Sequence, residues 1–123
     1  TGRVLVIDDD HAVRRTVTTY LRRCGITTFE ATTQEEARQL LAASGVDVVV
    51  TDGVIAGAPA ASLLRELRQS APALRVVLCS GGETEGFEAV RSLADATLPK
   101  PFELETLLTR LRPFMSTRES RIA

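Results

Sequence analysis

The stretch Val48-Val49-Val50-Thr51-Asp52 is a run of β-branched residues that ends in a single carboxylate. An apolar run without polar alternation is typical of a strand that is buried on both faces of a parallel sheet. In such sheets, ligands and chemistry gather at the carboxyl ends of the strands. The sequence therefore predicts that Asp52 lies at the functional edge of a parallel sheet.

Three other apolar runs also end in polar residues. They are Val4–Ile7 before Asp8-Asp9-Asp10, Val76–Cys79 before Ser80, and Ala96–Pro99 before Lys100. A weaker, Thr-rich strand is predicted over 26–31. Apolar residues at helical spacing separate the runs, so five strands alternate with five helices and an α/β doubly wound sandwich is expected. Right-handed crossovers would bring all the strand-to-helix loops to one edge of the sheet.

Local signals mark where the first two helices begin and end. The first carries Val13, Val17, Tyr20, Leu21 and Cys24 at helical spacing, and Gly25 supplies its stop. Thr33 and Glu36 match a capping box at the start of the second helix, which Gly45 ends. The residues from 53 to 59 contain two glycines and a proline and are predicted to form a loop.

Size and composition favour one globular domain, placed at residues 1–115, followed by a polar tail at 116–123. The chain has 123 residues, of which 44% are hydrophobic and 25% charged. A net charge of −1 argues against nucleic acid as a direct partner, and no apolar run approaches the roughly 20 residues of a membrane span. Cys24 and Cys79 lack metal-ligand spacing and are expected as reduced thiols in a cytoplasmic protein. The start at Thr1, without methionine, is typical of a fragment cut from a longer protein.

The clustered carboxylates point to a hard cation. Carboxylates that converge repel one another unless a cation intervenes, and oxygen ligands suit Mg²⁺. Asp9 and Asp52 are the candidates for direct ligation, with Asp8 acting through water. The alternative for Asp10 is that it caps the first helix, and this alternative is favoured.

Asp52 can also act as a nucleophile and form an acyl phosphate. Lys100, held between Pro99 and Pro101, would then place a positive charge on one phosphoryl oxygen, and the Ser80 hydroxyl would donate to another. A serine at a strand end is also common turn chemistry, so Ser80 is the weaker candidate. His11 is the only histidine, which argues against a Ser/His/Asp triad and a histidine-based metal site, and it is interpreted as an exposed residue of the first helical turn.

Together these residues resemble the receiver domain of two-component response regulators, over about residues 3–115. The resemblance implies a flavodoxin-like fold with strand order 2-1-3-4-5 and a signalling domain whose only chemistry is its own phosphorylation and dephosphorylation. It implies that a phosphohistidine of a sensor kinase or phosphotransfer domain phosphorylates Asp52. The implied Mg²⁺ (or Mn²⁺) ligands are Asp8, Asp9, Asp52 and the backbone carbonyl of Val54. Ser80 and Lys100 would sense the phosphoryl group.

The resemblance also implies a cis peptide bond between Lys100 and Pro101 and output by docking. The docking face is expected on the fourth and fifth helices and the last strand, where a homodimer could also form. The chain departs from the family pattern at Thr97, which replaces the switch aromatic three residues before the lysine. Ser80-Gly81-Gly82 looks like receivers attached to hybrid histidine kinases.

The loop after Asp52 departs from the pattern as well, because Gly53-Val54-Ile55-Ala56-Gly57 keeps only the last glycine. Valine at position 54 cannot hydrogen-bond to an attacking water. With Gly82 beside the site, this predicts slower decay of the phosphoryl form than in typical receivers.

Two other interpretations remain open from the sequence. One is a degenerate receiver that acts as a binding or dimerisation module without phosphorylation, which Thr97 and the altered loop favour. The other is a small phosphohydrolase similar to the haloacid dehalogenase superfamily, because Asp8-x-Asp10 after an apolar strand matches its motif. His11-Ala12 after that motif, the lack of an acidic pair after Lys100 and the short chain oppose the hydrolase.

Overall fold

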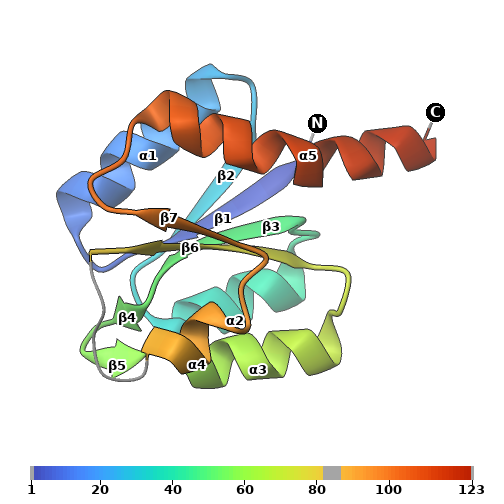
Figure 1. The fold of residues 1–123 in the computed structure, drawn as a ribbon. Helices are drawn as coiled ribbons and strands as arrows, with labels where there is room; N and C mark the ends of the chain where they lie inside the picture. The colour runs from blue at the N-terminus through green and yellow to red at the C-terminus, as the bar shows by residue number, and fades with distance from the viewer. Residues whose placement is uncertain (1, 82–86, 123) are drawn as a thin grey trace.

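The computed structural model describes residues 2–81 and 87–122, which form a parallel sheet with helices on both faces (Figure 1). The sheet has five strands in the order β2-β1-β3-β6-β7. Their bounds are β1 (Arg3–Ile7), β2 (Thr27–Ala31), β3 (Val48–Asp52), β6 (Arg75–Ser80) and β7 (Ala96–Pro99). Counting these five strands alone, the order is 2-1-3-4-5, so the predicted flavodoxin-like fold is confirmed.

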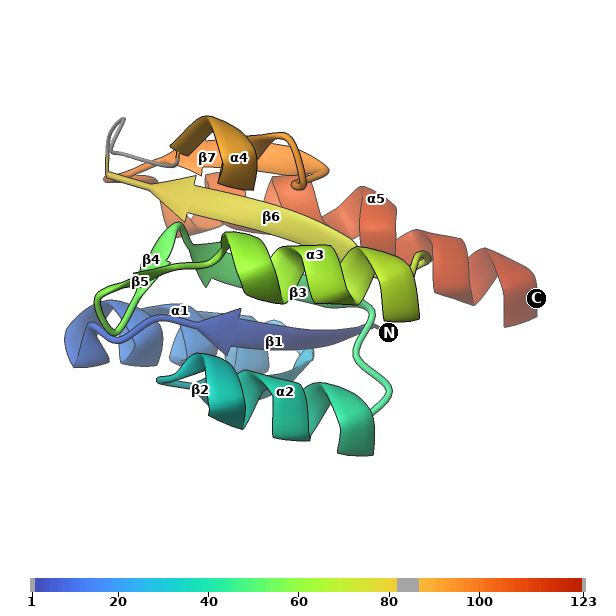
Figure 2. The ribbon, with the colours of Figure 1, turned by 90° about the horizontal axis from the view of Figure 1, so that it is seen from below.

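The helices form two layers, which Figures 1 and 2 show from the side and from below. One face of the sheet carries α1 (His11–Arg23) and α5 (Leu104–Ile122), and the other carries α2 (Gln34–Ala43), α3 (Ala61–Ser70) and α4 (Phe87–Arg91). Successive strand residues point to opposite faces, so each strand contributes side chains to the hydrophobic core on both faces of the sheet. Leu5 and Ile7 pack on the α2–α3 side, and Val4 and Val6 pack on the α1–α5 side. Burial on both faces explains the unbroken apolar runs.

The helix starts follow the predicted caps. Asp10 is the N-cap of α1, and its Oδ1 accepts a hydrogen bond from the backbone N–H of Val13 at 3.1 Å. Thr33 caps α2 through its Oγ1, which accepts from the N–H of Glu36 at 3.1 Å. In a standard capping box the Glu36 side chain would accept from the N–H of the N-cap residue Thr33. Here Glu36 Oε1 accepts instead from the N–H of Thr32, one residue earlier, at 2.9 Å.

The segment predicted as a loop after Asp52 contains a short antiparallel ladder. In it β4 (Val54–Ile55) pairs with β5 (Ala58–Pro59). Ala56 and Gly57 form the turn with φ of 50° and 82°, the positive values that a two-residue hairpin turn requires. Ile55 is buried and anchors the ladder to the α2–α3 side of the core. Strands of two residues are too short to give a periodic signal, so the prediction of a loop was wrong here.

The last helix is longer than the sequence pattern indicates. α5 continues to Ile122, over residues assigned to a polar tail, and the boundary of the receiver domain at residue 115 stays a prediction. None of the helices in the described part of the chain combines the length and hydrophobicity of a membrane span.

Candidate functional site

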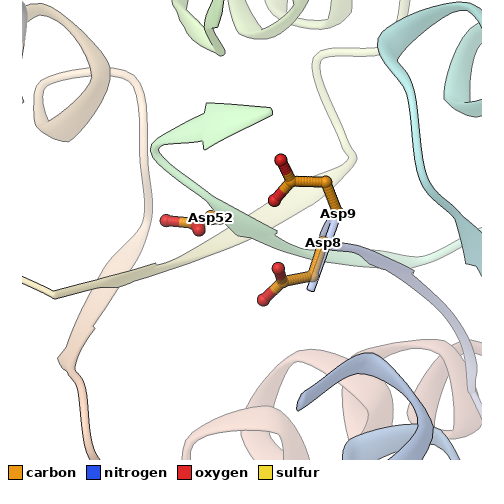
Figure 3. Close-up of side chains that lie close together, drawn as sticks. All are labelled: Asp8, Asp9 and Asp52. Carbon is orange, nitrogen blue, oxygen red and sulfur yellow. The ribbon is translucent and has the colours of Figure 1, made fainter. Parts of the chain in front are cut away.

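Three carboxylates meet at the carboxyl edge of the sheet. Asp8 and Asp9 follow β1, and Asp52 ends the neighbouring strand β3, with Ile7 and Thr51 paired in register just before them. One carboxylate oxygen from each aspartate lies within 4.8 Å of the others (Figure 3). Asp8 is 5% exposed, whereas Asp9 is open to solvent. The cluster therefore has one buried and one accessible side.

Main-chain N–H groups orient all three carboxylates. In each aspartate one carboxylate oxygen accepts from a main-chain N–H, which restricts the rotation of the carboxylate and leaves its second oxygen for other partners. The bonds are Asp10 N–H to Asp8 Oδ1 at 2.9 Å, Gly53 N–H to Asp52 Oδ1 at 2.7 Å, and Ala56 N–H to Asp9 Oδ2 at 3.1 Å. The third bond ties the β4–β5 hairpin to the acidic cluster.

Lys100 is the cation of this cluster. Its Nζ lies 3.0 Å from Asp8 Oδ2 and 3.3 Å from Asp52 Oδ2. Burial lowers the pKa of the Lys100 ammonium, but its hydrogen bond to Asp8 and the charge of Asp52 outweigh this effect, so the pKa lies above its ordinary value. The peptide bond between Lys100 and Pro101 is cis, the isomer that the resemblance implies.

The donor set fits a hard divalent cation. Three carboxylates and one ammonium leave the cluster with a formal charge of −2, and all the candidate ligands are oxygen atoms. Within the residues that the structure describes, this is the only group of three or more acidic, histidine or cysteine side chains close enough to share an ion. The residues could hold Mg²⁺, with exposed Asp9 on the side from which water reaches the site.

The other predicted site residues lie on β4, β6 and β7. Ser80 ends β6, and its carbonyl oxygen accepts from the N–H of Lys100 at 2.8 Å. Thr97 lies in β7 opposite Leu78 and on the face that α3 and α4 cover, since its neighbour Leu98 belongs to the α1–α5 core. Val54 in β4 has 37% of its surface exposed. Gly82, named beside the site, lies outside the described residues.

Cys79 is buried in β6, opposite Asp52 in the register of the sheet. Burial raises the pKa of its thiol to about 12, so the sulfur stays protonated at physiological pH. Among the described cysteines, both of which are free, only Cys24 is exposed.

Sequence reasoning missed Arg14, a buried residue behind Asp8. Its Nη1 donates to the backbone carbonyl of Asp8 at 3.0 Å, and its Nε donates to Glu30 Oε1 at 3.2 Å. The buried face of α1 consists of Arg14, Val17, Thr18 and Leu21, a stripe at i, i+3, i+4 and i+7.

Of the apolar positions that the sequence pattern placed on this helix, Val17 and Leu21 are buried. Val13 and Tyr20 are only partly buried, and Cys24 is exposed beyond the end of the helix. An arginine in phase with Val17 and Leu21 was the signal that could have identified Arg14.

The comparisons agree with this geometry. The response regulator receiver domain family matches residues 4–112, and the chain belongs to that family. The chain is 35% identical to the sensor kinase CckA of Brucella abortus, over 94% of this chain and 13% of that protein. It is 33% identical to the response regulator MprA of Mycolicibacterium vanbaalenii, over 92% of this chain and 50% of that protein. The chain thus spans half or less of the length of these curated relatives.

Solved structures of receiver domains have the same fold as this chain. The receiver domain of the Francisella response regulator 1452 has a TM-score of 0.84 and 28% identity, covering 96% of this chain and 99% of that one. A CheY-like receiver domain protein from Methanospirillum hungatei has a TM-score of 0.87 at 20% identity, covering 98% of each chain, and shares the fold. Receiver domains are signalling modules, so the phosphohydrolase interpretation is set aside.

Proposed function

We propose that this domain accepts a phosphoryl group on Asp52 from a phosphohistidine of a sensor kinase or phosphotransfer domain in the cytoplasm. The observation that carries the proposal is the arrangement of Asp8, Asp9, Asp52 and Lys100 at one sheet edge of a receiver fold. Three mutually repelling carboxylates beside a partly buried lysine favour this function over a degenerate receiver, because a bound cation would offset their repulsion.

The proposed transfer is a displacement at phosphorus. A carboxylate oxygen of Asp52 attacks, the new O–P bond forms as the P–N bond to the imidazole breaks, and the histidine leaves with its electron pair. Mg²⁺ or Mn²⁺, held by Asp8, Asp9, Asp52 and the Val54 carbonyl, would supply charge neutralisation for the phosphoryl oxygens. The Lys100 ammonium contacts one phosphoryl oxygen, and the Ser80 hydroxyl donates to another.

Phosphorylation would then act as a switch for docking. It adds about −1.5 to −2 charges next to Lys100, which must exchange carboxylate contacts for phosphoryl contacts. Shifting a two-state equilibrium from 1:99 to 99:1 requires about 5.5 kcal/mol of differential binding, which a few charge-assisted hydrogen bonds can supply. We propose that the responding surface comprises α4, β7 and α5, with Thr97 at the switch position, and that partners or a second copy of the chain dock there.

Labelling with acetyl phosphate tests the acceptor. We expect wild-type protein to gain one phosphoryl group by intact mass spectrometry, in a Mg²⁺-dependent manner, and Asp52→Asn to gain none. Asp47→Asn is the matched control, since Asp47 lies at the opposite end of β3 and its carboxylate accepts from the N–H of Arg3. Undiminished labelling of Asp52→Asn would refute the acceptor assignment, and unlabelled wild type would favour the degenerate module.

The sub-class within the family remains a prediction. The identities to a sensor kinase and to response regulators are nearly equal, at 35% and 33%. The Ser80-Gly81-Gly82 pattern is the feature that favours the receiver of a hybrid kinase.

A further inference from the structure

Arg14 is buried behind the acidic cluster, with 8% of its surface exposed. A buried guanidinium is costly unless its donors are matched by acceptors. Here the acceptors are the Asp8 carbonyl at 3.0 Å, Glu30 Oε1 at 3.2 Å and His11 Nδ1 at 2.9 Å. The first of these belongs to the main chain of the proposed cation site.

The Asp8 carbonyl is one end of the peptide plane that joins Asp8 to Asp9. The other side of Asp8 is also fixed, because its N–H donates to the carbonyl of Ala31 in β2 at 3.2 Å. A plane held by a donor from α1 restricts ψ of Asp8 and φ of Asp9, since these are the two soft dihedrals beside it. The directions of both carboxylates thus depend on the bond from Arg14.

Glu30 in turn orients Arg14. Its two carboxylate oxygens contact Arg14 and Arg15, at 3.2 and 2.8 Å, and Arg22 lies 3.6 Å away. Glu30 is therefore held on strand β2 by three cations, and its fixed carboxylate sets the plane of the Arg14 guanidinium. Because the guanidinium is planar and rigid, fixing its Nε through Glu30 also fixes the direction in which its other N–H groups donate.

We propose that Arg14, oriented by Glu30, is a positioning residue for the cation site, which fixes the Asp8–Asp9 peptide so that both carboxylates face the ion. The proposal rests on the proposed function, because it assigns a support to the same site. It does not place Arg14 in contact with the ion or the phosphoryl group.

The direction in which cation affinity changes on removal of Arg14 distinguishes a positioning role from a simple effect of its positive charge. Arg14 carries a positive charge close to the site, so its removal would strengthen cation binding if charge alone mattered. If Arg14 positions the ligands, its removal weakens binding. Loss of a group that orients metal ligands typically costs 10- to 100-fold in affinity.

The experiment measures Mn²⁺ affinity by electron paramagnetic resonance, and Mg²⁺ affinity by competition, on the full chain. We expect Arg14→Met to raise the dissociation constant about tenfold. Arg14→Lys keeps the charge but loses the fork, so we expect it also to bind more weakly than wild type. Glu30→Gln should show a smaller loss than Arg14→Met. Urea unfolding in EDTA establishes that each variant is folded.

Arg68 offers a matched control at the other edge of the sheet. It also donates to main-chain carbonyls, of Leu93 and Leu74, and pairs with Asp95. Arg68→Met should lower stability but leave the Mn²⁺ dissociation constant unchanged.

Unchanged or tighter Mn²⁺ binding by folded Arg14→Met would overturn the positioning role. If Arg68→Met weakened Mn²⁺ binding as much as Arg14→Met, the loss would reflect lower stability of the fold and the positioning role would also be overturned. If wild-type protein binds neither ion, the proposed function fails together with this inference. If wild type binds and only the Arg14 result fails, the proposed function stands.

Discussion

Replacing Asp9 by asparagine should stabilise the metal-free protein. Asp9 Oδ2 accepts from the N–H of Ala56, and the amide oxygen of asparagine can accept the same bond. The contacts of Lys100 go to Asp8 and Asp52, so they are not removed. The substitution therefore deletes one negative charge from the cluster and keeps its hydrogen bond.

The size of the gain follows from the geometry of the cluster. Carboxylate oxygens of Asp9, Asp8 and Asp52 lie within 4.8 Å of one another. At that separation, two unit charges repel by about 0.9 kcal/mol in water and about 3.5 kcal/mol at an effective dielectric constant of about 20. Because Asp9 is exposed and Lys100 attracts it, the lower limit applies, and we expect a net gain of about 1 kcal/mol.

Magnesium should reverse the order of stability. An ion that binds only the native state stabilises it by about 2.7 kcal/mol at a concentration 100 times its dissociation constant. Wild-type protein receives this gain, whereas Asp9→Asn lacks a ligand and receives less. Urea unfolding at pH 7, in EDTA and then in saturating Mg²⁺, measures both differences. Raising the ionic strength should shrink the metal-free gain, since Asp9 is accessible to salt.

Asp10→Asn is the control for this experiment. Asp10 carries the same charge one residue later, but it caps α1, and asparagine caps a helix about as well as aspartate. We expect little change in stability and an undiminished gain from Mg²⁺. If Asp9→Asn is less stable than wild type in EDTA, repulsion does not govern the cluster. If it gains as much as wild type from Mg²⁺, Asp9 is not a ligand.

Three further predictions concern Lys100, the two cysteines and Val54. The pKa of Lys100, the only lysine in the sequence, lies above the ordinary 10.5. The stability that the Lys100 ammonium gives to the folded protein is therefore complete below pH 10.5 and is lost as the pH rises through the folded pKa. An NMR titration of the Lys100 ε-carbon that gives a pKa at or below 10.5 would contradict this. A thiol reagent at pH 8 should modify Cys24 alone in the native protein and both cysteines in urea, because the pKa of Cys79 is about 12. The phosphoryl form should decay slowly, and Val54→Asn, which can hydrogen-bond to water, should shorten its half-life several-fold after the phosphodonor is removed; wild-type decay within seconds would be the opposite result.

The strands of the sheet were predictable because buried parallel strands have a distinct apolar pattern, whereas their order was implied by the resemblance to receiver domains. Val48–Val50 and Val76–Leu78 are apolar at every position, which only burial on both faces permits. Once the strands were assigned, the handedness of the crossovers placed Asp8, Asp52 and Lys100 at one edge without any side-chain information. Leu63, Leu64 and Leu67 of α3 lie at helical spacing and are buried.

The supports of the site were not predictable in the same way. Gly53 and Ala56 act through backbone N–H groups, which every residue except proline carries, so their roles leave no trace in residue type. Arg14 acts through a long side chain from a helix, and an arginine on a helix is most often a solvated residue. Sequence reasoning located the polar side chains at the strand ends. It missed the backbone N–H groups and the arginine that orient those side chains.

Lys100 connects the acidic cluster to the last strand of the sheet. Its ammonium contacts Asp8 and Asp52, while its main-chain N–H donates to the Ser80 carbonyl at 2.8 Å as the final rung between β6 and β7. A change of charge at Asp52 therefore acts on a residue whose backbone is hydrogen-bonded to the end of the sheet. This connection does not pass through Thr97, which lies three residues earlier in β7 and opposite Leu78. The missing switch aromatic thus leaves one physical link between Asp52 and the α4, β7 and α5 surface intact.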